Sequence, residues 1–350
     1  MTDSTLGTLT PLAGQSIKLN GISLVGSGSA TPSQRVNNDK LSERVDTSDS
    51  WIRTRTGIQE RRISTPGESV SILAQRSAHA AIEMAGWAPQ DVDLIVLATS
   101  TPDDLFGSAP KLQADLGASN AVAFDLTAAC SGFLFALISA AQFLRTGEMT
   151  RALVIGADQL SRWVNWDDRS TCVLFGDGAG AVALESTSVD QDGLLGFKLK
   201  SDGLRGQCLT LKQFEEPLPL IDGSSYQRGG FAPIQMNGKE VFKFAAREVP
   251  LILQELLSSS SMEASCLDWL LLHQANQRIL DAVADRFAIP HQKVLSNLAS
   301  YGNTSAATIP LMLDEAVRGG LVKPGHLIAT SGFGAGLSWG AALLRWHGPA

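Results

Sequence analysis

This chain of 350 residues contains a candidate nucleophile, a cysteine at the junction of two apolar elements. Cys130 lies in the segment Thr127-Ala128-Ala129-Cys130-Ser131-Gly132, between a predicted strand and a predicted helix. A thiol at a helix N-terminus feels the positive end of the helix dipole, which favours the thiolate. The small neighbouring residues leave room for a substrate. The same pattern also fits a buried structural cysteine, and a nucleophile would need a base from elsewhere in the chain.

A histidine and an asparagine stand at comparable junctions in the second half of the chain. His273 follows the apolar run at 270–272, and the end of a strand is the usual place for functional groups in α/β folds. Asn303 follows a glycine that permits a sharp turn and precedes a predicted helix. Its amide can donate a hydrogen bond to a substrate or can simply cap the helix. A lone histidine can likewise be structural, so neither segment decides the question alone.

These residues need elements to position them, and the chain supplies such elements twice in the same order. The first half predicts strands at 21–26, 92–98, 121–126, 152–157 and 176–182, with helices at 69–86 and 131–144. The second half predicts helices at 239–257, 277–287 and 305–318, with strands at 267–272, 293–297, 326–330 and 338–345. We expect a duplicated α/β protein with parallel sheets sandwiched by helices, in which the candidate residues meet where the halves join.

The predicted boundaries follow from the repeat. Residues 1–20 read as an N-terminal tail, residues 21–186 as the first half and residues 187–350 as the second half. The stretch at 202–233 interrupts the repeat because it is polar and rich in proline and glycine. We predict that it forms a surface insertion or flap.

Composition excludes several classes of protein. Hydrophobic residues make up 44% of the chain and charged residues 18%, a balance typical of globular proteins. The net charge of −7 and the absence of basic runs argue against a nucleic-acid partner. We see neither a signal peptide nor an apolar stretch of roughly 20 residues that could span a membrane. The four cysteines lack metal-site spacing. We therefore expect a cytoplasmic protein with reduced cysteines, no metal and no membrane partner.

Taken together, the segments resemble the β-ketoacyl–acyl-carrier-protein synthase III family, over about residues 21–345. Cys130, His273 and Asn303 match the Cys-His-Asn set of that family, whereas the elongating synthases carry Cys-His-His and thiolases use a second cysteine that has no match here. The resemblance implies a thiolase-like fold, with two α/β halves in an α-β-α-β-α sandwich. The matching segments are TAACSG at 127–132, WIRTRTGI at 51–58, FGDGAG at 175–180, HQAN at 273–276, YGNTSA at 301–306 and GFGAG at 332–336.

The resemblance also implies a reaction. A thiolate of Cys130 takes an acyl group from an acyl-CoA primer, expected to be acetyl-CoA. Malonyl–acyl carrier protein then loses CO2, and the resulting carbanion attacks the acyl group to give a 3-oxoacyl product that begins fatty acid synthesis. His273 Nε2 and the Asn303 amide are expected to donate hydrogen bonds to the thioester oxygen. No cofactor is implied beyond these substrates, and the expected partners are an acyl carrier protein and a second copy of the chain.

Further site residues are implied by position. Those matching the CoA and pantetheine site are Trp51, Arg55, Arg169, Gly238, Phe242 and Asn276. Those matching the acyl pocket are Phe106, which the family inserts from the partner subunit, and Phe333. Those matching the carrier-protein surface are Lys243, Gln274 and Arg278. The predicted helix at 277–287 is less basic than the family pattern, because Asp281 and Asp285 accompany its arginines.

Three other functions share these features. A polyketide-type or quinolone-type synthase using malonyl-CoA would carry the same Cys-His-Asn set. A plain acyltransferase or thioesterase-like hydrolase of the same fold would form the acyl-enzyme without decarboxylating malonyl thioester. A non-catalytic scaffold would be expected to have lost one of the three residues, and all three are present.

Overall fold

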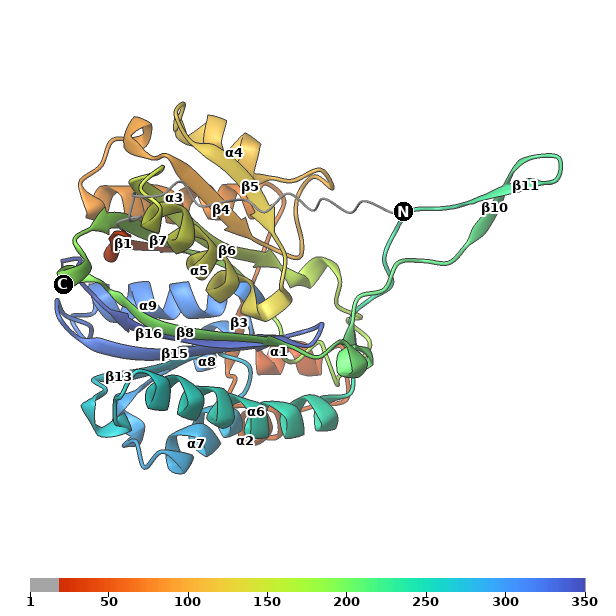
Figure 1. Ribbon diagram of the computed structural model, residues 1–350. Helices are drawn as coiled ribbons and strands as arrows, with labels where there is room; N and C mark the ends of the chain where they lie inside the picture. Colours follow the sequence, from red (N-terminus) through yellow and green to blue (C-terminus); the bar gives the residue numbers. More distant parts are fainter. Residues whose placement is uncertain (1–18, 350) are drawn as a thin grey trace, which may run out of the picture.

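The computed structural model describes residues 19–349, and it consists of two five-stranded sheets stacked with helices in five layers. In Figure 1 the two sheets lie one above the other, with α5 (Gly132–Arg145) and α9 (Thr308–Arg318) between them. The outer layers are formed by α3 (Val70–Ala85) and α4 (Ala109–Leu116) on one side and by α6 (Gly238–Ser259) and α7 (Gln277–Arg286) on the other. The expected thiolase-like α-β-α-β-α sandwich is confirmed.

The first sheet is built from the first half of the chain, in the order β1-β7-β6-β4-β5. Strand β4 pairs in parallel with β5 and β6, while β7 runs antiparallel to β6 and β1. Every residue of β4 is buried, as expected for an apolar run covered on both faces. The strands are β1 (Gly21–Ala30), β4 (Leu94–Ala98), β5 (Val122–Leu126), β6 (Arg151–Gln159) and β7 (Asp177–Thr187).

The second sheet is built from the second half, in the order β14-β13-β15-β16-β8. Strand β13 pairs in parallel with β14 and β15, and β16 runs antiparallel to β15 and β8. The two sheets therefore repeat one pattern, a parallel centre with an antiparallel flank. The strands are β8 (Leu194–Ser201), β13 (Trp269–Leu272), β14 (Val294–Leu295), β15 (Leu327–Gly334) and β16 (Ser338–Arg345).

The two central helices hold equivalent places in the two halves. Helix α5 is apolar on almost every side, because both of its faces pack against sheets. Side chains of α5, α9 and the inner faces of both sheets form one continuous core. Each central helix is preceded by a single 3-10 turn, η2 (Ala129–Ser131) before α5 and η8 (Ser305–Ala307) before α9, and these two turns contact each other.

The remaining helices and strands are short and lie outside the two five-stranded sheets. The helices are α1 (Asn38–Ser42), α2 (Asp49–Thr56) and α8 (Leu298–Tyr301). The strands are β2 (Gln34–Asn37), β3 (Glu60–Ile63), β9 (Leu209–Thr210), β10 (Pro217–Ile221), β11 (Ser224–Gln227) and β12 (Gln235–Met236).

The insertion predicted at 202–233 is a surface feature. Strands β10 and β11 pair as an antiparallel hairpin that extends away from the body of the molecule (Figure 1). Its apolar side chains Leu220 and Ile221 are exposed. The tail predicted at 1–20 lies outside the described residues except for its last two. Within residues 19–349, every helix is too short or too polar to cross a membrane.

The helix predicted over 305–318 differs from the observed structure at its start. Residues Ser305–Ala307 form the 3-10 turn η8, and α9 begins only at Thr308. Ser305 has a φ of +53°, in the left-handed region, so the chain bends sharply there before the helix starts. The bend brings Asn303 and Ser305 to the same place relative to α9 that the Cys130 segment has relative to α5.

Candidate active site

Cys130, His273 and Asn303 line one cavity of about 350 Å³ between the two halves of the protein. Cys130 comes from η2, at the start of α5. His273 directly follows β13, and Asn303 lies between α8 and η8. The three side chains are buried, and each lies in a turn or short connection next to a strand or helix. The chain segments that carry them are distant in sequence and are brought together by the stacking of the two sheets.

The thiol of Cys130 is buried, with 7% of its residue surface exposed. Burial raises the pKa of this thiol to about 12, a hydrogen bond with the Ser305 side chain acts to lower it, and the nearby Asp158 carboxyl raises it further. The thiolate that we expected from the helix N-terminus is therefore not the resting form. The prediction was wrong because the loss of water around the sulfur outweighs the stabilisation offered by the turn. Deprotonation has to accompany the attack on a substrate.

The amide of Asn303 is oriented by the backbone of the following turn. Its Oδ1 accepts a hydrogen bond from the backbone N–H of Ser305 at 2.8 Å. This contact identifies the oxygen end of the amide, so the Nδ2 end is available as a donor to the cavity. The backbone of Asn303 is held by two hydrogen bonds to the first half, from its N–H to the Leu174 carbonyl (2.8 Å) and from the Gly176 N–H to its own carbonyl (3.0 Å).

The imidazole of His273 is fixed by a hydrogen bond and by an aromatic ring. Its Nδ1 lies 2.7 Å from Oγ1 of Thr308, in the first turn of α9. The Phe333 ring packs edge-on against it, with ring centroids 5.1 Å apart. Burial lowers the pKa of His273 to about 3, so the ring is neutral at physiological pH.

The backbone N–H of Cys130 is a further hydrogen-bond donor beside the sulfur. Strand β15 passes so close to η2 that a Cβ on Gly334 would lie 2.6 Å from the backbone nitrogen of Cys130. A glycine is needed at this position because any side chain would collide with that backbone. Since the Cys130 N–H makes no backbone hydrogen bond within residues 19–349, it can donate to an oxygen atom bound near the sulfur.

The same cavity extends as a tunnel from Cys130 to exposed residues of α2, α6 and α7, and five of the six residues matched to the CoA site border it. Trp51, Arg55, Gly238, Phe242 and Asn276 all border the cavity that holds Cys130. Two guanidinium groups lie against the Trp51 ring, with Arg55 at 4.5 Å and Arg169 at 5.2 Å from the ring centroid. Asn276 caps α7 and donates from Nδ2 to the Arg55 carbonyl at 3.1 Å.

A second cavity, of about 900 Å³, opens on the other side of Cys130 and is mostly apolar. Phe106 borders this cavity and is 98% exposed, so no residue in the range 19–349 covers its ring. Leu209 and Leu211, from the start of the insertion, also border the cavity. Phe333 does not. The prediction that placed Phe333 in the acyl pocket was wrong, since its ring packs on His273 and borders the tunnel instead.

The three residues matched to a carrier-protein surface differ in exposure. Lys243 is exposed on α6 and pairs with Glu240 at 2.9 Å. Arg278 is exposed on α7, borders the tunnel and donates to the Thr54 carbonyl at 3.0 Å. Gln274 is 0% exposed, and its amide bonds to the Leu272 carbonyl inside the protein. Gln274 therefore cannot contact a docked protein, and that prediction is corrected.

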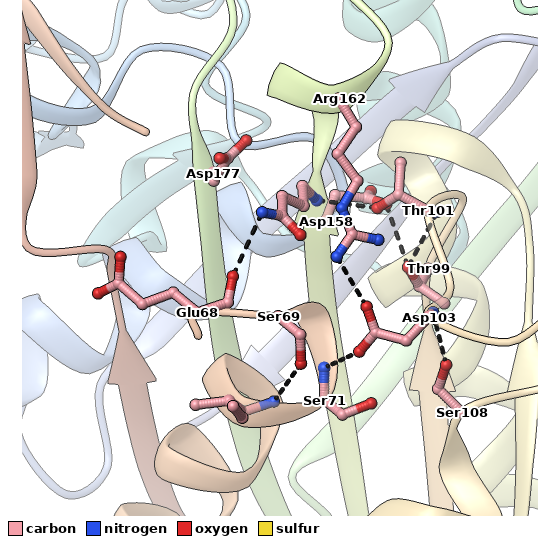
Figure 2. Close-up of polar contacts among 12 residues, drawn as sticks. Glu68, Ser69, Ser71, Thr99, Thr101, Asp103, Ser108, Asp158, Arg162 and Asp177 are labelled. Atoms are coloured by element: carbon pink, nitrogen blue, oxygen red, sulfur yellow. Dashed lines mark hydrogen bonds and ion pairs between the residues drawn. The ribbon is translucent and has the colours of Figure 1, made fainter. Parts of the chain in front are cut away.

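A buried carboxyl beside the site escaped the analysis of the sequence. Asp158, at the end of β6, accepts hydrogen bonds from the Ser100 N–H (2.8 Å), the Thr101 hydroxyl (2.9 Å) and, from the second half, the Ala306 N–H (3.2 Å). Figure 2 shows Asp158 beside Thr99 and Thr101. Burial raises the pKa of this carboxyl, while the Ser305 side chain and the other donors act to lower it. The sequence did contain a signal for Asp158, because this carboxyl residue directly follows the apolar strand predicted at 152–157.

Comparison with known proteins agrees with this geometry. The family described as 3-oxoacyl-[acyl-carrier-protein (ACP)] synthase III matches residues 124–203, and its C-terminal part matches residues 257–346. The chain is 73% identical to a β-ketoacyl-[acyl-carrier-protein] synthase III of Prochlorococcus marinus (strain MIT 9313), over 94% of this chain and 97% of the relative. It is 68% identical to the enzyme of that name from Synechococcus sp. (strain WH7803), over 97% and 100%.

Solved structures show the same likeness. The fold matches 3-oxoacyl-[acyl-carrier-protein] synthase III from Aquifex aeolicus VF5 with a TM-score of 0.84 and 42% identity, covering 93% of this chain and 100% of that one. It also matches the priming β-ketosynthase of the R1128 polyketide pathway with a TM-score of 0.86 and 32% identity, covering 97% and 100%. On the relatives' identity and coverage, this chain belongs to the β-ketoacyl-[acyl-carrier-protein] synthase III family of condensing acyltransferases.

Proposed function

We propose that this enzyme starts fatty acid synthesis by joining an acyl-CoA primer, acetyl-CoA in the first instance, to malonyl–acyl carrier protein. The products are a 3-oxoacyl carrier protein, CoA and CO2. The observation that carries the proposal is the meeting of Cys130, His273 and Asn303 in one tunnel-shaped cavity, which is also bordered by residues matched to the CoA site and which adjoins a larger apolar pocket at Cys130.

In the first half-reaction the sulfur of Cys130 attacks the thioester carbonyl of the primer. The acyl chain enters the apolar pocket beside Phe106, while CoA leaves through the tunnel. The negative charge on the tetrahedral oxygen is held by the backbone N–H of Cys130, which faces the gap beside Gly334.

In the second half-reaction the malonyl thioester occupies the tunnel and loses CO2. The resulting enolate oxygen is held by Nδ2 of Asn303 and by Nε2 of His273 in its protonated form. The orientation of the Asn303 amide, set by the Ser305 N–H, supports this role because it turns the donor end toward the cavity. The carbanion then attacks the acyl group on Cys130. The reaction is organic chemistry on thioesters, and we propose that it needs no cofactor.

The residues at the tunnel mouth suit the nucleotide end of CoA. A purine can stack on the flat face of Trp51, and the guanidinium groups of Arg55 and Arg169 can pair with phosphate oxygens. Arg278 is exposed and borders the same tunnel, and Lys243 is exposed on α6, so we propose that both contact the acidic acyl carrier protein.

We further propose that two copies of the chain assemble as a homodimer. The exposed ring of Phe106 would then enter the acyl pocket of the partner, which explains how an apolar side chain tolerates 98% exposure in the single chain. All four cysteines are free, which suits the reducing cytoplasm, and we propose that compartment as the site of action.

The test is intact-protein mass spectrometry after incubation with acetyl-CoA, followed by addition of malonyl–acyl carrier protein. We expect a mass increase of one acetyl group that disappears on the second addition, with release of a 3-oxoacyl carrier protein. Cys130→Ser should remain unmodified, whereas Cys266→Ser, which changes an exposed cysteine, should behave as wild type. If no primer acylates the protein, the mechanism is refuted.

One second function is favoured by a specific observation, the match to a priming ketosynthase of a polyketide pathway over 97% of the chain. An enzyme of that kind would fit the same cavities. Comparing the discharge of acyl-Cys130 by malonyl–acyl carrier protein with its discharge by malonyl-CoA separates the two malonyl carriers. Discharge without a new carbon–carbon bond would instead identify an acyltransferase or hydrolase.

A further inference from the structure

His273 and Thr308 share a short hydrogen bond that joins the second sheet to a central helix. Nδ1 of His273, just after β13, lies 2.7 Å from the hydroxyl oxygen of Thr308, and both side chains are buried. Thr308 is the first residue of α9. Its hydroxyl also donates to the carbonyl oxygen of Ser305 at 3.0 Å.

The contact with Ser305 determines which nitrogen of His273 carries the proton. A hydroxyl has one proton to donate and two lone pairs with which to accept. Because the proton of Thr308 goes to the Ser305 carbonyl, the hydroxyl oxygen can only accept from the imidazole, and Nδ1 must be the protonated nitrogen. The reverse arrangement would leave two oxygen atoms 3.0 Å apart with no proton between them.

The second ring nitrogen, Nε2, is left with a free lone pair. It makes no hydrogen bond with any residue in the range 19–349, and His273 borders the cavity that also contains Cys130 and Asn303. The ring is neutral because burial lowers the pKa of His273 to about 3. Nε2 can therefore accept a proton, but cannot donate one until it has received it.

We propose that Thr308 is a positioning residue that keeps the resident proton of His273 on Nδ1, so that Nε2 exchanges protons with the sulfur of Cys130 in both half-reactions. The inference rests on the proposed acyl-Cys130 mechanism and deepens it. It assigns a residue outside the Cys-His-Asn set to the control of proton movement.

The protons balance in the first half-reaction. Nε2 takes the proton of the Cys130 thiol as the bond forms between its sulfur and the acyl carbon. The bond between that carbon and the sulfur of CoA breaks, and Nε2 gives the proton to the departing CoA thiolate. His273 returns to its neutral form with the proton on Nδ1.

The protons also balance in the second half-reaction. The malonyl group brings a carboxylate into the cavity, and a nearby negative charge favours the protonated imidazole, so Nε2 binds one proton from solvent. Nε2–H then donates to the thioester oxygen while the carboxylate leaves as CO2. When the new carbon–carbon bond displaces the sulfur of Cys130, the thiolate takes the proton from Nε2.

The test combines a tautomer measurement with an acylation rate. Nitrogen-15 NMR of the free protein distinguishes the two neutral tautomers, and the spectrum of His273→Asn assigns the signal among the five histidines. We expect protonated Nδ1 in wild type. In Thr308→Val, Nδ1–H would have no acceptor, so the proton should move to Nε2. Acylation of Cys130 by acetyl-CoA should then slow by roughly 10²-fold, the scale of a lost general base. The remaining acylation rate of the variant should increase with pH.

Thr308→Ser is the matched control, since it retains the hydroxyl and should retain both the tautomer and the rate. A wild-type spectrum with protonated Nε2 would overturn the proposal. So would acylation of Cys130 in Thr308→Val at the rate of the wild type. These outcomes differ from failure of the proposed function. The tautomer is measured without substrate, whereas absence of acyl-Cys130 in wild type would refute the underlying reaction.

Discussion

The side-chain oxygen of Asn303 accepts a hydrogen bond from the backbone N–H of Ser305, two residues later, at 2.8 Å. This contact requires the sharp bend at Ser305, whose φ is +53°. The bend aims the N–H back toward Asn303 and thereby fixes the direction of its amide. An asparagine that could have served only as a helix cap is instead oriented as a donor to the cavity beside Cys130.

Asn303→Ala should separate the two half-reactions. Loss of one oxyanion donor typically lowers a rate by about 10²–10³, so we expect the release of CO2 from malonyl–acyl carrier protein to fall by that factor. Acylation of Cys130 should change much less, since the proposed mechanism gives Asn303 no role in that step. Radiolabelled CO2 release and intact mass measure the two steps independently. Equal losses in both steps would show that Asn303 acts on the structure of the site as a whole.

Gly334→Ala should damage the acylation step. The new Cβ would lie 2.6 Å from the backbone nitrogen of Cys130, so the backbone must shift and the N–H loses its direction. We expect acylation to slow by roughly 10²-fold and unfolding free energy to fall by about 1–3 kcal/mol. Gly203→Ala is the control, because its Cβ would meet no atom within 4 Å. Normal acylation by Gly334→Ala would exclude the Cys130 N–H from the reaction.

Trp51→Ala should weaken binding of acyl-CoA without changing the chemistry. Stacking of a base on an aromatic ring is worth about 1–3 kcal/mol, so KM for acetyl-CoA should rise roughly 5- to 150-fold at nearly constant kcat. Acetyl-pantetheine lacks the nucleotide and supplies the control substrate, with which wild type and variant should perform alike. A loss of equal size with both substrates would place the effect of Trp51 away from the nucleotide.

His273 should make stability depend on pH. Its pKa is lowered from 6.5 to about 3 by burial, so the folded protein disfavours the proton that the unfolded chain accepts. The stabilisation is fully present above pH 6.5 and is lost as pH falls toward 3. Between pH 7 and pH 5 we expect wild type to lose about 2 kcal/mol of unfolding free energy relative to His273→Asn, measured by urea titration.

A second histidine, His291, provides a control because its pKa is shifted in the opposite direction. The hydrogen bond to Asp285, followed by that carboxylate's charge, raises the pKa of the exposed His291. The stabilisation that His291 gives to the folded protein is therefore present at low pH and is lost as pH rises. His291→Asn should lose stability relative to wild type as the solution is acidified, the reverse of His273→Asn. Parallel pH dependences for wild type and His273→Asn would contradict a buried neutral imidazole.

The order of elements and the placement of the candidate catalytic residues could be predicted from the sequence alone. Apolar runs such as β4 and β13 identify buried strands, and the positions of Cys130, His273 and Asn303 beside such elements are local properties of the chain. The duplication was also visible, because each half repeats the same succession of strands and helices. These features depend on residues that are neighbours in sequence, which is why pattern and motif revealed them.

Only the tertiary structure decided the state and the direction of the groups in the site. The resting thiol of Cys130 follows from burial between two sheets, and the inward-facing amide of Gln274 follows from the packing of β13 and β14. The Nδ1 proton that we propose for His273 rests on its contact with Thr308, which is 35 residues away in sequence. Desolvation and hydrogen-bond direction are set by atoms from distant segments, so no local pattern could contain them.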